Sequence, residues 1–314
     1  AASQAGAGEP LKRNDFEALQ LECRGLRFSA ASAGSGPLVI LLHGFPDCYR
    51  SFDAQLIALA EAGYRAVAVA LRGYERSSQP ADGDYSQAAL VGDVLAFLDV
   101  LLDDADQAEA GVGRAHLIGH DWGAAIAYPA AAAAPARFHS LVTLAVPHSG
   151  RFLRELRAHP RQLRLSWYMG FFQLPWLPER VLRRRDFAFL RRLWRQWSPG
   201  WAFTDEAFEP VARAFRDHGV VEAALAYYRA AVSLRSLLPG AGAAASFEVP
   251  VPTLAMTGEH DGCIAAEVFA AMCRDEDFPA GLRVERIEGA GHFLHREKPD
   301  EVNARILAWL DERG

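Results

Sequence analysis

The chain has 314 residues, of which 51% are hydrophobic and 23% are charged, and its 33 basic and 39 acidic residues give a formal net charge of −6. This is the composition of a globular protein, and it excludes a disordered chain, a collagen and a coiled coil. Because the whole chain is acidic, its composition does not favour a nucleic acid or an anionic lipid as a partner.

Three features bear on the cellular compartment. The longest apolar stretch, 124–136, is mostly alanine and contains two prolines, whereas a membrane span needs about 20 strongly apolar residues. Residues 1–10 lack the basic region and apolar segment of a signal peptide. The four cysteines show no CxxC pair and no spacing of a zinc site. We therefore expect a soluble, reduced, cytoplasmic protein with no membrane span and no metal.

Short β-type runs alternate with helix-length stretches along most of the chain. The segments 18–23 and 26–31 are predicted to form an antiparallel hairpin at one edge of a sheet. Buried strands are predicted at 38–42, 66–69, 115–118, 141–146, 253–257 and 283–287. Helices are predicted at 52–62, 86–102, 124–134, 265–273 and 300–310. This alternation is typical of a doubly wound, mostly parallel α/β sheet.

The alternation stops between residues 147 and 238, where no strand pattern is found and five of the seven tryptophans lie. We interpret this stretch as an inserted helical cap between a first part of the α/β core, 1–146, and a second part, 239–314. Its aromatic residues either pack the cap itself or line a pocket where cap and sheet meet, which is a preferred place for ligand sites. The glycine- and alanine-rich run 239–245 suits the linker that leaves the cap.

The strongest chemical signal is Gly119-His120-Asp121-Trp122-Gly123, at the point where a predicted strand meets a predicted helix. Small residues two positions on either side of a central residue permit the sharp turn of a nucleophile elbow, which presents the central side chain. Such a string in isolation is common in ordinary turns. In this context, it makes Asp121 the candidate nucleophile.

A second signal, His43-Gly44-Phe45-Pro46, directly follows the predicted strand 38–42. A loop in this place supplies one backbone N–H of an oxyanion hole, and the residue after the nucleophile supplies the other. We therefore expect the amides of Phe45 and Trp122 to be the two donors. The competing interpretation is an ordinary strand-to-helix turn.

The candidate base is His292, on a glycine-rich loop after the predicted strand 283–287, and His295 is its nearest competitor. An acid that accepts the imidazole N–H holds the ring in the tautomer needed to activate water. Asp261 follows the predicted strand 253–257 and is the preferred acid, with Glu259 as the alternative. The chain order of nucleophile, acid and base is that of the α/β-hydrolases, with a carboxylate in place of serine.

At this point the sequence resembles the α/β-hydrolase-fold epoxide hydrolases and their haloalkane dehalogenase relatives. The resemblance rests on His43-Gly44-Phe45-Pro46, Arg72-Gly73-Tyr74, Gly119-His120-Asp121-Trp122-Gly123, Asp261, Gly291-His292 and Lys298-Pro299-Asp300-Glu301-Val302-Asn303, and it covers nearly the whole chain after the first dozen residues. It implies an α/β-hydrolase sheet with an inserted helical cap, and a cofactor-independent enzyme.

The chemistry of the leaving group distinguishes epoxide hydrolysis from haloalkane dehalogenation. An opening epoxide develops a basic alkoxide and needs acidic O–H donors, whereas a halide needs only neutral donors. The segments that begin at Tyr168 and at Tyr227 resemble the two cap segments of epoxide hydrolases that carry such donors, and they point to Tyr168 and Tyr228. Neighbouring helical residues point about 100° apart, so Tyr227 and Tyr228 cannot both reach one oxygen. Phe172, with Phe45 and Trp122, is expected to contact the substrate.

The sequence therefore predicts an epoxide hydrolase that converts an apolar epoxide to a vicinal diol through an ester on Asp121. One alternative is a haloalkane-type dehalogenase in which Trp122 and a cap residue hold the halide. Another is a non-catalytic binder of small molecules on the same fold, which an intact catalytic triad disfavours. The expected partner is a small-molecule epoxide, without nucleic acid, and the chain is expected to be a monomer or a homodimer.

Overall fold

The computed structural model describes residues 11–12, 15–103, 113–231 and 248–313. The predicted linker 239–245, the end of the predicted cap at 232–238 and the N-terminal segment 1–10 lie outside the described residues. No helix in the described part of the chain has the length and apolar character needed to cross a membrane.

The core is an eight-stranded sheet in the order β1-β2-β4-β3-β5-β6-β7-β8. Its strands are β1 (Glu17–Cys23), β2 (Leu26–Ala33), β3 (Leu38–Leu42), β4 (Arg65–Val69), β5 (Ala115–His120), β6 (Phe138–Leu144), β7 (Thr253–Gly258) and β8 (Leu282–Ile287). β1 pairs with β2 and β2 with β4 in antiparallel fashion, and the other described pairs are parallel. The predicted edge hairpin and parallel sheet are therefore confirmed.

One predicted boundary is wrong, because β6 begins at Phe138 and ends at Leu144 and does not run over 141–146. Phe138 pairs with Ala115 of β5 and is fully buried, so the strand starts where its neighbour starts. Ala145 has a positive φ of 67° and ends the extended backbone before Val146.

Helices cover both faces of the sheet. The core helices are α1 (Asp53–Glu61), α2 (Gln87–Leu102), α4 (Trp122–Ala133), α12 (Ala266–Met272), α13 (Leu294–Glu297) and α14 (Pro299–Asp311). Alternate residues of β3 point to opposite faces, and Val39 and Leu41 pack in one apolar cluster with α1 and α14. Leu38, Ile40 and Leu42 pack in a second cluster with α2 and α4. The sheet is thus buried on both faces, as a parallel sheet requires.

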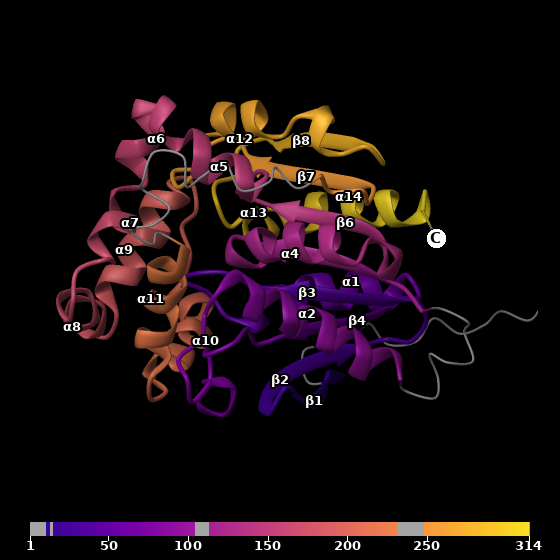
Figure 1. Cartoon of the computed structure of the whole chain (residues 1–314), viewed down its shortest axis with the longest axis horizontal. Coiled ribbons are helices and arrows are strands. Elements are labelled where there is room, and N and C mark those ends of the chain that lie inside the picture. The colour runs from indigo at the N-terminus through magenta and orange to yellow at the C-terminus, as the bar shows by residue number, and fades with distance from the viewer. Residues whose placement is uncertain (1–10, 13–14, 104–112, 232–247, 314) are drawn as a thin grey trace, which may run out of the picture.

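Between β6 and β7 the only regular elements of the described chain are helices, which lie together at one end of the sheet (Figure 1). They are α5 (Ser149–Glu155), α6 (Pro160–Leu165), α7 (Trp167–Phe171), α8 (Leu177–Arg183), α9 (Ala188–Trp197), α10 (Asp205–Arg216) and α11 (Val220–Ala231). We propose that this group is the cap assigned to 147–238.

Hydrogen bonds join α9 to the loops at the ends of the core strands. The indole of Trp194 donates to the carbonyl oxygen of Pro46 at 2.8 Å. The carbonyl oxygen of Trp197 accepts from the amides of Gly262 at 2.9 Å and His292 at 3.0 Å. The cap helices therefore help to fix the loops on which the predicted catalytic residues lie.

Candidate active site

Asp121 lies between β5 and α4 with φ 51° and ψ −117°, a backbone conformation that costs energy in a residue other than glycine. The residues two positions before and after Asp121 are glycines, and each has a steric reason to be one. A Cβ atom on Gly119 would lie 2.5 Å from the Gly123 carbonyl carbon, and one on Gly123 would lie 2.0 Å from the Leu42 carbonyl oxygen. The GxDxG pattern is therefore a sharp turn that only glycine at both positions allows, as the sequence predicts.

The two carboxylate oxygens of Asp121 have different surroundings. The backbone N–H of Phe45 donates to Oδ1 at 2.7 Å. Oδ2 lies 3.4 Å from Nε2 of His292. Trp122 is the first residue of α4, where backbone N–H groups have no partner within the helix. The structure thus brings the Phe45 amide to the Asp121 carboxylate, and the role of the Trp122 amide stays a prediction.

His43 supports the loop that carries Phe45. Its Nδ1 lies 3.0 Å from the Gly44 carbonyl oxygen, and its Nε2 accepts from the amide of Leu71 at 3.1 Å. Burial lowers the pKa of His43 to about 4, so the ring is neutral at neutral pH. Gly44 has no room for a side chain, because a Cβ atom there would lie 2.3 Å from the Cβ atom of Asp121.

His292 and Asp261 form a hydrogen-bonded pair next to Asp121. Nδ1 of His292 lies 3.0 Å from Asp261 Oδ2, and both side chains are fully buried. Burial opposes the charged imidazole, but the Asp261 and Asp121 carboxylates outweigh it and raise the pKa of His292 to about 10. The ring is therefore an imidazolium at neutral pH as long as Asp121 is ionised.

The other oxygen of Asp261 is bound by its own loop. Its Oδ1 accepts from the amides of Cys263 at 2.7 Å and Ile264 at 2.9 Å. The alternative acid, Glu259, accepts from the amide of Gly289 at 3.0 Å and lies at the surface. The geometry therefore selects Asp261.

Tyr168 on α7 and Tyr228 on α11 face one another, with ring centroids 5.8 Å apart. Both are buried and line the cavity that contains Asp121. Burial raises both pKa values well above 10, and the charge of Asp121 adds to the effect at each phenol. Both hydroxyls therefore keep their protons and can donate. Tyr227, by contrast, donates to the carbonyl oxygen of Arg72 at 2.7 Å.

Phe45 and Phe172, which are predicted to contact the substrate, lie against the tyrosines of the cavity. Both side chains are fully buried, and neither is among the described residues that line the cavity. The ring of Phe172 packs against Tyr168 and Tyr228 with centroids 5.6 Å and 5.0 Å away, and the ring of Phe45 lies 5.3 Å from Tyr228. In this structure the two rings support the tyrosine rings, and contact of Phe45 and Phe172 with the substrate stays a prediction. Trp122 does line the cavity.

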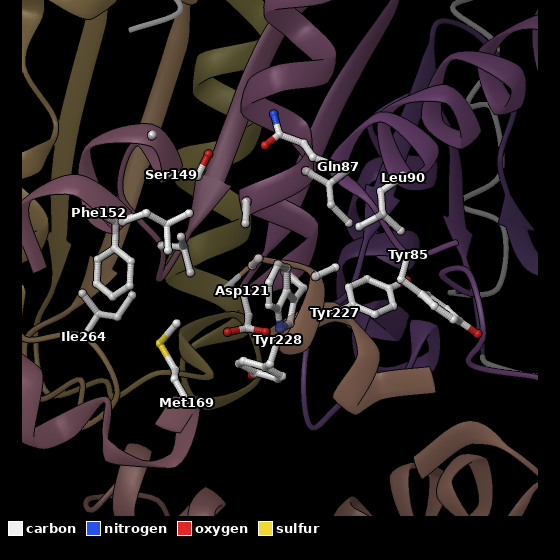
Figure 2. Close-up of a pocket in the computed structure, with 18 of the residues that line it drawn as sticks. Tyr85, Gln87, Leu90, Asp121, Ser149, Phe152, Met169, Tyr227, Tyr228 and Ile264 are labelled. Carbon is white, nitrogen blue, oxygen red and sulfur yellow. The ribbon is translucent and has the colours of Figure 1, made fainter. Parts of the chain in front are cut away.

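The cavity has a volume of about 230 Å³. Figure 2 shows Asp121 and Tyr228 near its centre, with Phe152, Ile264 and Met169 on one side and Tyr85, Leu90 and Tyr227 on the other. Among the described residues that line it, Asp121 carries the only charged side chain, and the polar Gln87 and Ser149 lie away from the centre. The cavity therefore suits a neutral, apolar molecule.

Cys263 and Gln162 contact residues of the candidate site, and the sequence analysis did not identify either of them. The thiol of Cys263 lies 3.3 Å from the Tyr168 hydroxyl, and the amide of Cys263 binds Asp261. The side chain of Gln162 donates to the Cys263 carbonyl oxygen at 2.8 Å and accepts from Ala265 at 3.0 Å. All four cysteines are free, as expected, and Cys263 contacts two residues of the candidate site. No motif marks either residue, because the contact between Cys263 and Tyr168 and the two contacts of Gln162 join residues distant in sequence.

One buried group has the residue types of a metal site. Asp47, His120 and His295 are fully buried, and their ligand atoms all lie within 4.8 Å of one another. The distances from Asp47 Oδ2 are 3.8 Å to His120 and 4.0 Å to His295. Zinc bonds of about 2.0–2.1 Å in a tetrahedron place ligand atoms roughly 3.3 Å apart, so the group is wider than a zinc site. His295, the competitor of His292, lies in this group and not beside Asp121.

The chain was compared with known proteins. A family model described as the alpha/beta hydrolase fold matches residues 37–299. Epoxide hydrolase 4 of Homo sapiens is 32% identical over 94% of this chain and 78% of its own length. Epoxide hydrolase 3 of Siraitia grosvenorii is 31% identical over 95% of this chain and 99% of its own length.

Solved structures agree with these relatives. The Bacillus megaterium epoxide hydrolase in complex with an inhibitor matches with a TM-score of 0.80 and 27% identity over 93% of this chain and 100% of that one. The epoxide hydrolase of Vigna radiata matches with a TM-score of 0.77 and 25% identity over 96% of this chain and 99% of that one. From its fold, the layout of its site and these matches, the chain belongs to the α/β-hydrolase-fold epoxide hydrolase family.

Proposed function

We propose that the protein hydrolyses a neutral, apolar epoxide to a vicinal diol through a covalent ester on Asp121. The observation that carries this proposal is the pair of buried, protonated phenols in the cavity of Asp121. A halide leaving group would not require acidic O–H donors, whereas the alkoxide of an opening epoxide does.

In the first step, Oδ2 of Asp121 attacks an epoxide carbon and the C–O bond breaks. The electron pair remains on the epoxide oxygen, which receives a hydrogen bond or a proton from Tyr168 and Tyr228. Oδ1, already bound by the N–H of Phe45, becomes the carbonyl oxygen of the ester. Support for this assignment of the two oxygens is that Oδ1 has a backbone donor, whereas no backbone donor to Oδ2 is found in the described part of the chain.

In the second step, water attacks Cγ of the Asp121 ester. Ester formation removes the negative charge of Asp121, one of the causes of the raised pKa of His292, so the imidazolium can give up its proton. The alkoxide of the opened epoxide takes up this proton, relayed by the hydroxyls of Tyr168 and Tyr228, and the neutral imidazole is then a base. His292 takes a proton from water, and the N–H groups of Phe45 and Trp122 stabilise the oxyanion at Oδ1. The Cγ–Oδ2 bond then breaks, and the diol leaves with Oδ2 and a proton from His292. The second proton of the water passes from the new carboxyl group of Asp121 to His292, which restores the carboxylate and the imidazolium.

The test is a panel of styrene oxide, an epoxy fatty acid and a haloalkane, with diol and halide measured as products. We expect diol from the neutral epoxide and no halide. Tyr168→Phe and Tyr228→Phe should each slow diol formation by on the order of 10²-fold, the low end of the contribution of a general acid.

Tyr74→Phe is the matched control, because the buried hydroxyl of Tyr74 has no hydrogen-bond partner among the described residues. Its activity should stay near that of the wild type. Halide release without epoxide turnover would support a dehalogenase instead. Tight binding of epoxides without any product would support a non-catalytic binder.

A further inference from the structure

Exposed apolar side chains gather on one part of the cap. Seven large hydrophobic residues are exposed in the described structure, and six of them lie between residues 153 and 177. These six are Leu153, Leu163, Trp167, Leu174, Trp176 and Leu177, which lie on α5 to α8 and on the segment between α7 and α8, and we call this exposed set the cap outer face. Trp176 is 69% exposed and Trp167 is 48% exposed. Exposed apolar groups concentrated in this way mark an interaction site.

The same segment is strongly basic although the whole chain is acidic. Residues 151–185 contain nine arginines and two glutamates, whereas the chain has a formal charge of −6. Arg154, Arg157, Arg164 and Arg180 are exposed, and none of them has an acidic partner among the described residues. Arginine combined with exposed tryptophan and leucine is the composition of surfaces that bind at a membrane interface.

The cap outer face also adjoins the cavity. Leu153 is 47% exposed and at the same time lines the cavity of Asp121. α7 exposes Trp167 and buries Tyr168, the predicted donor, one residue later. Figure 1 shows α6, α7 and α8 in succession along the side of the cap that faces away from the sheet. The cap outer face and the cavity of Asp121 therefore share Leu153.

We propose that the cap outer face docks on an anionic lipid bilayer. The positive charge argues against a second copy of this chain, since two such faces would repel one another. The docking stands on the exposed side chains alone. The proposal has a second part, which rests on the proposed function: an apolar epoxide dissolved in the bilayer enters the cavity past Leu153.

The test is sedimentation of the whole protein with vesicles of phosphatidylglycerol and phosphatidylcholine, compared with vesicles of phosphatidylcholine alone. The wild type should bind the anionic vesicles, and added salt should weaken the binding. Arg154→Gln combined with Arg157→Gln should lower the partition coefficient about thirtyfold, since each basic residue near an anionic surface contributes roughly a fivefold effect. Trp167→Ser combined with Trp176→Ser should lower it by at least about tenfold.

Val284→Ser is the matched control, because Val284 is exposed but lies on β8 outside the cap outer face. It should bind vesicles as the wild type does. No binding to either vesicle would overturn the proposal, and so would equal binding to both kinds without an effect of the arginine changes. A dimer without lipid that the tryptophan changes dissociate would show that the face self-associates, which also overturns it.

Diol formation from a water-soluble epoxide is measured in every variant. It should stay unchanged, which shows that the variants are folded and that the site is intact. Vesicle binding without any diol formation would overturn the proposed function but leave the docking standing.

Discussion

His292 shows how the charge of one residue decides what another can do. Its imidazole contacts two carboxylates, Asp261 at 3.0 Å and Asp121 at 3.4 Å, and together they outweigh the effect of burial on its pKa. As an imidazolium it cannot accept a proton from water. Loss of the charge of Asp121 lowers the pKa of His292, so the proposed mechanism makes ester formation the event that activates the second step.

We therefore expect Asp121→Asn to lower the pKa of His292 from about 10. The measurement is an NMR titration of the histidine rings, with His292→Gln to identify the signal. A pKa that does not change in Asp121→Asn would show that Asp121 does not hold the proton on His292.

The same shift affects stability. A histidine whose pKa is about 10 in the folded protein and 6.5 in the unfolded chain stabilises the fold fully below pH 6.5. This stabilisation is lost as the pH rises through about 10. The free energy of unfolding of the wild type should therefore fall more steeply over this range than that of Asp121→Asn.

At the scale of elements, the turn from β5 to α4 determines where the nucleophile lies. A Cβ atom on Gly119, Gly123 or Gly44 would lie within 2.5 Å of another atom, and for Gly44 that atom belongs to Asp121 itself. The close packing of three backbone segments therefore positions the carboxylate between the Phe45 amide and His292. A Cβ atom on Gly119 or Gly123 would meet backbone atoms, so rotation of a side chain cannot relieve the clash.

Gly123→Ala should lower the free energy of unfolding by about 1–3 kcal/mol or more. Gly170→Ala on α7 is the control, since a Cβ there meets nothing within 4 Å, and it should raise stability by about 0.5–1 kcal/mol. Urea denaturation of both variants checks this. Equal stability of the two variants would contradict the account of the turn.

The sequence predicted the strands and helices that alternate along the core, and it predicted the candidate site residues that follow the strands. The strands of the sheet, and the positions of Asp121, Asp261 and His292 at the ends of β5, β7 and β8, followed from apolar runs and glycine-rich turns. The place of Phe172 did not follow, because its burial behind Tyr168 and Tyr228 depends on how α7 and α11 pack. The contact of Cys263 with Tyr168 joins residues 95 positions apart and has no local pattern.

At the scale of the whole molecule, charge is divided unevenly between cap and core. The net charge of −6 argued against an anionic lipid partner, yet residues 151–185 contain nine arginines and two glutamates. A total charge averages over the molecule, whereas a surface meets a partner locally. The cap thus covers the proposed catalytic residues on its inner side and exposes arginine and tryptophan on its outer side.

The most direct test of the ester on Asp121 is a single turnover with excess enzyme in water labelled with ¹⁸O. Water attacks Cγ and the diol leaves with Oδ2, so the label should appear in the peptide that contains Asp121, and the diol of this first turnover should carry none. Mass spectrometry of peptide and diol measures both. Labelled diol with an unlabelled Asp121 peptide would show that water opens the epoxide directly and would contradict the account.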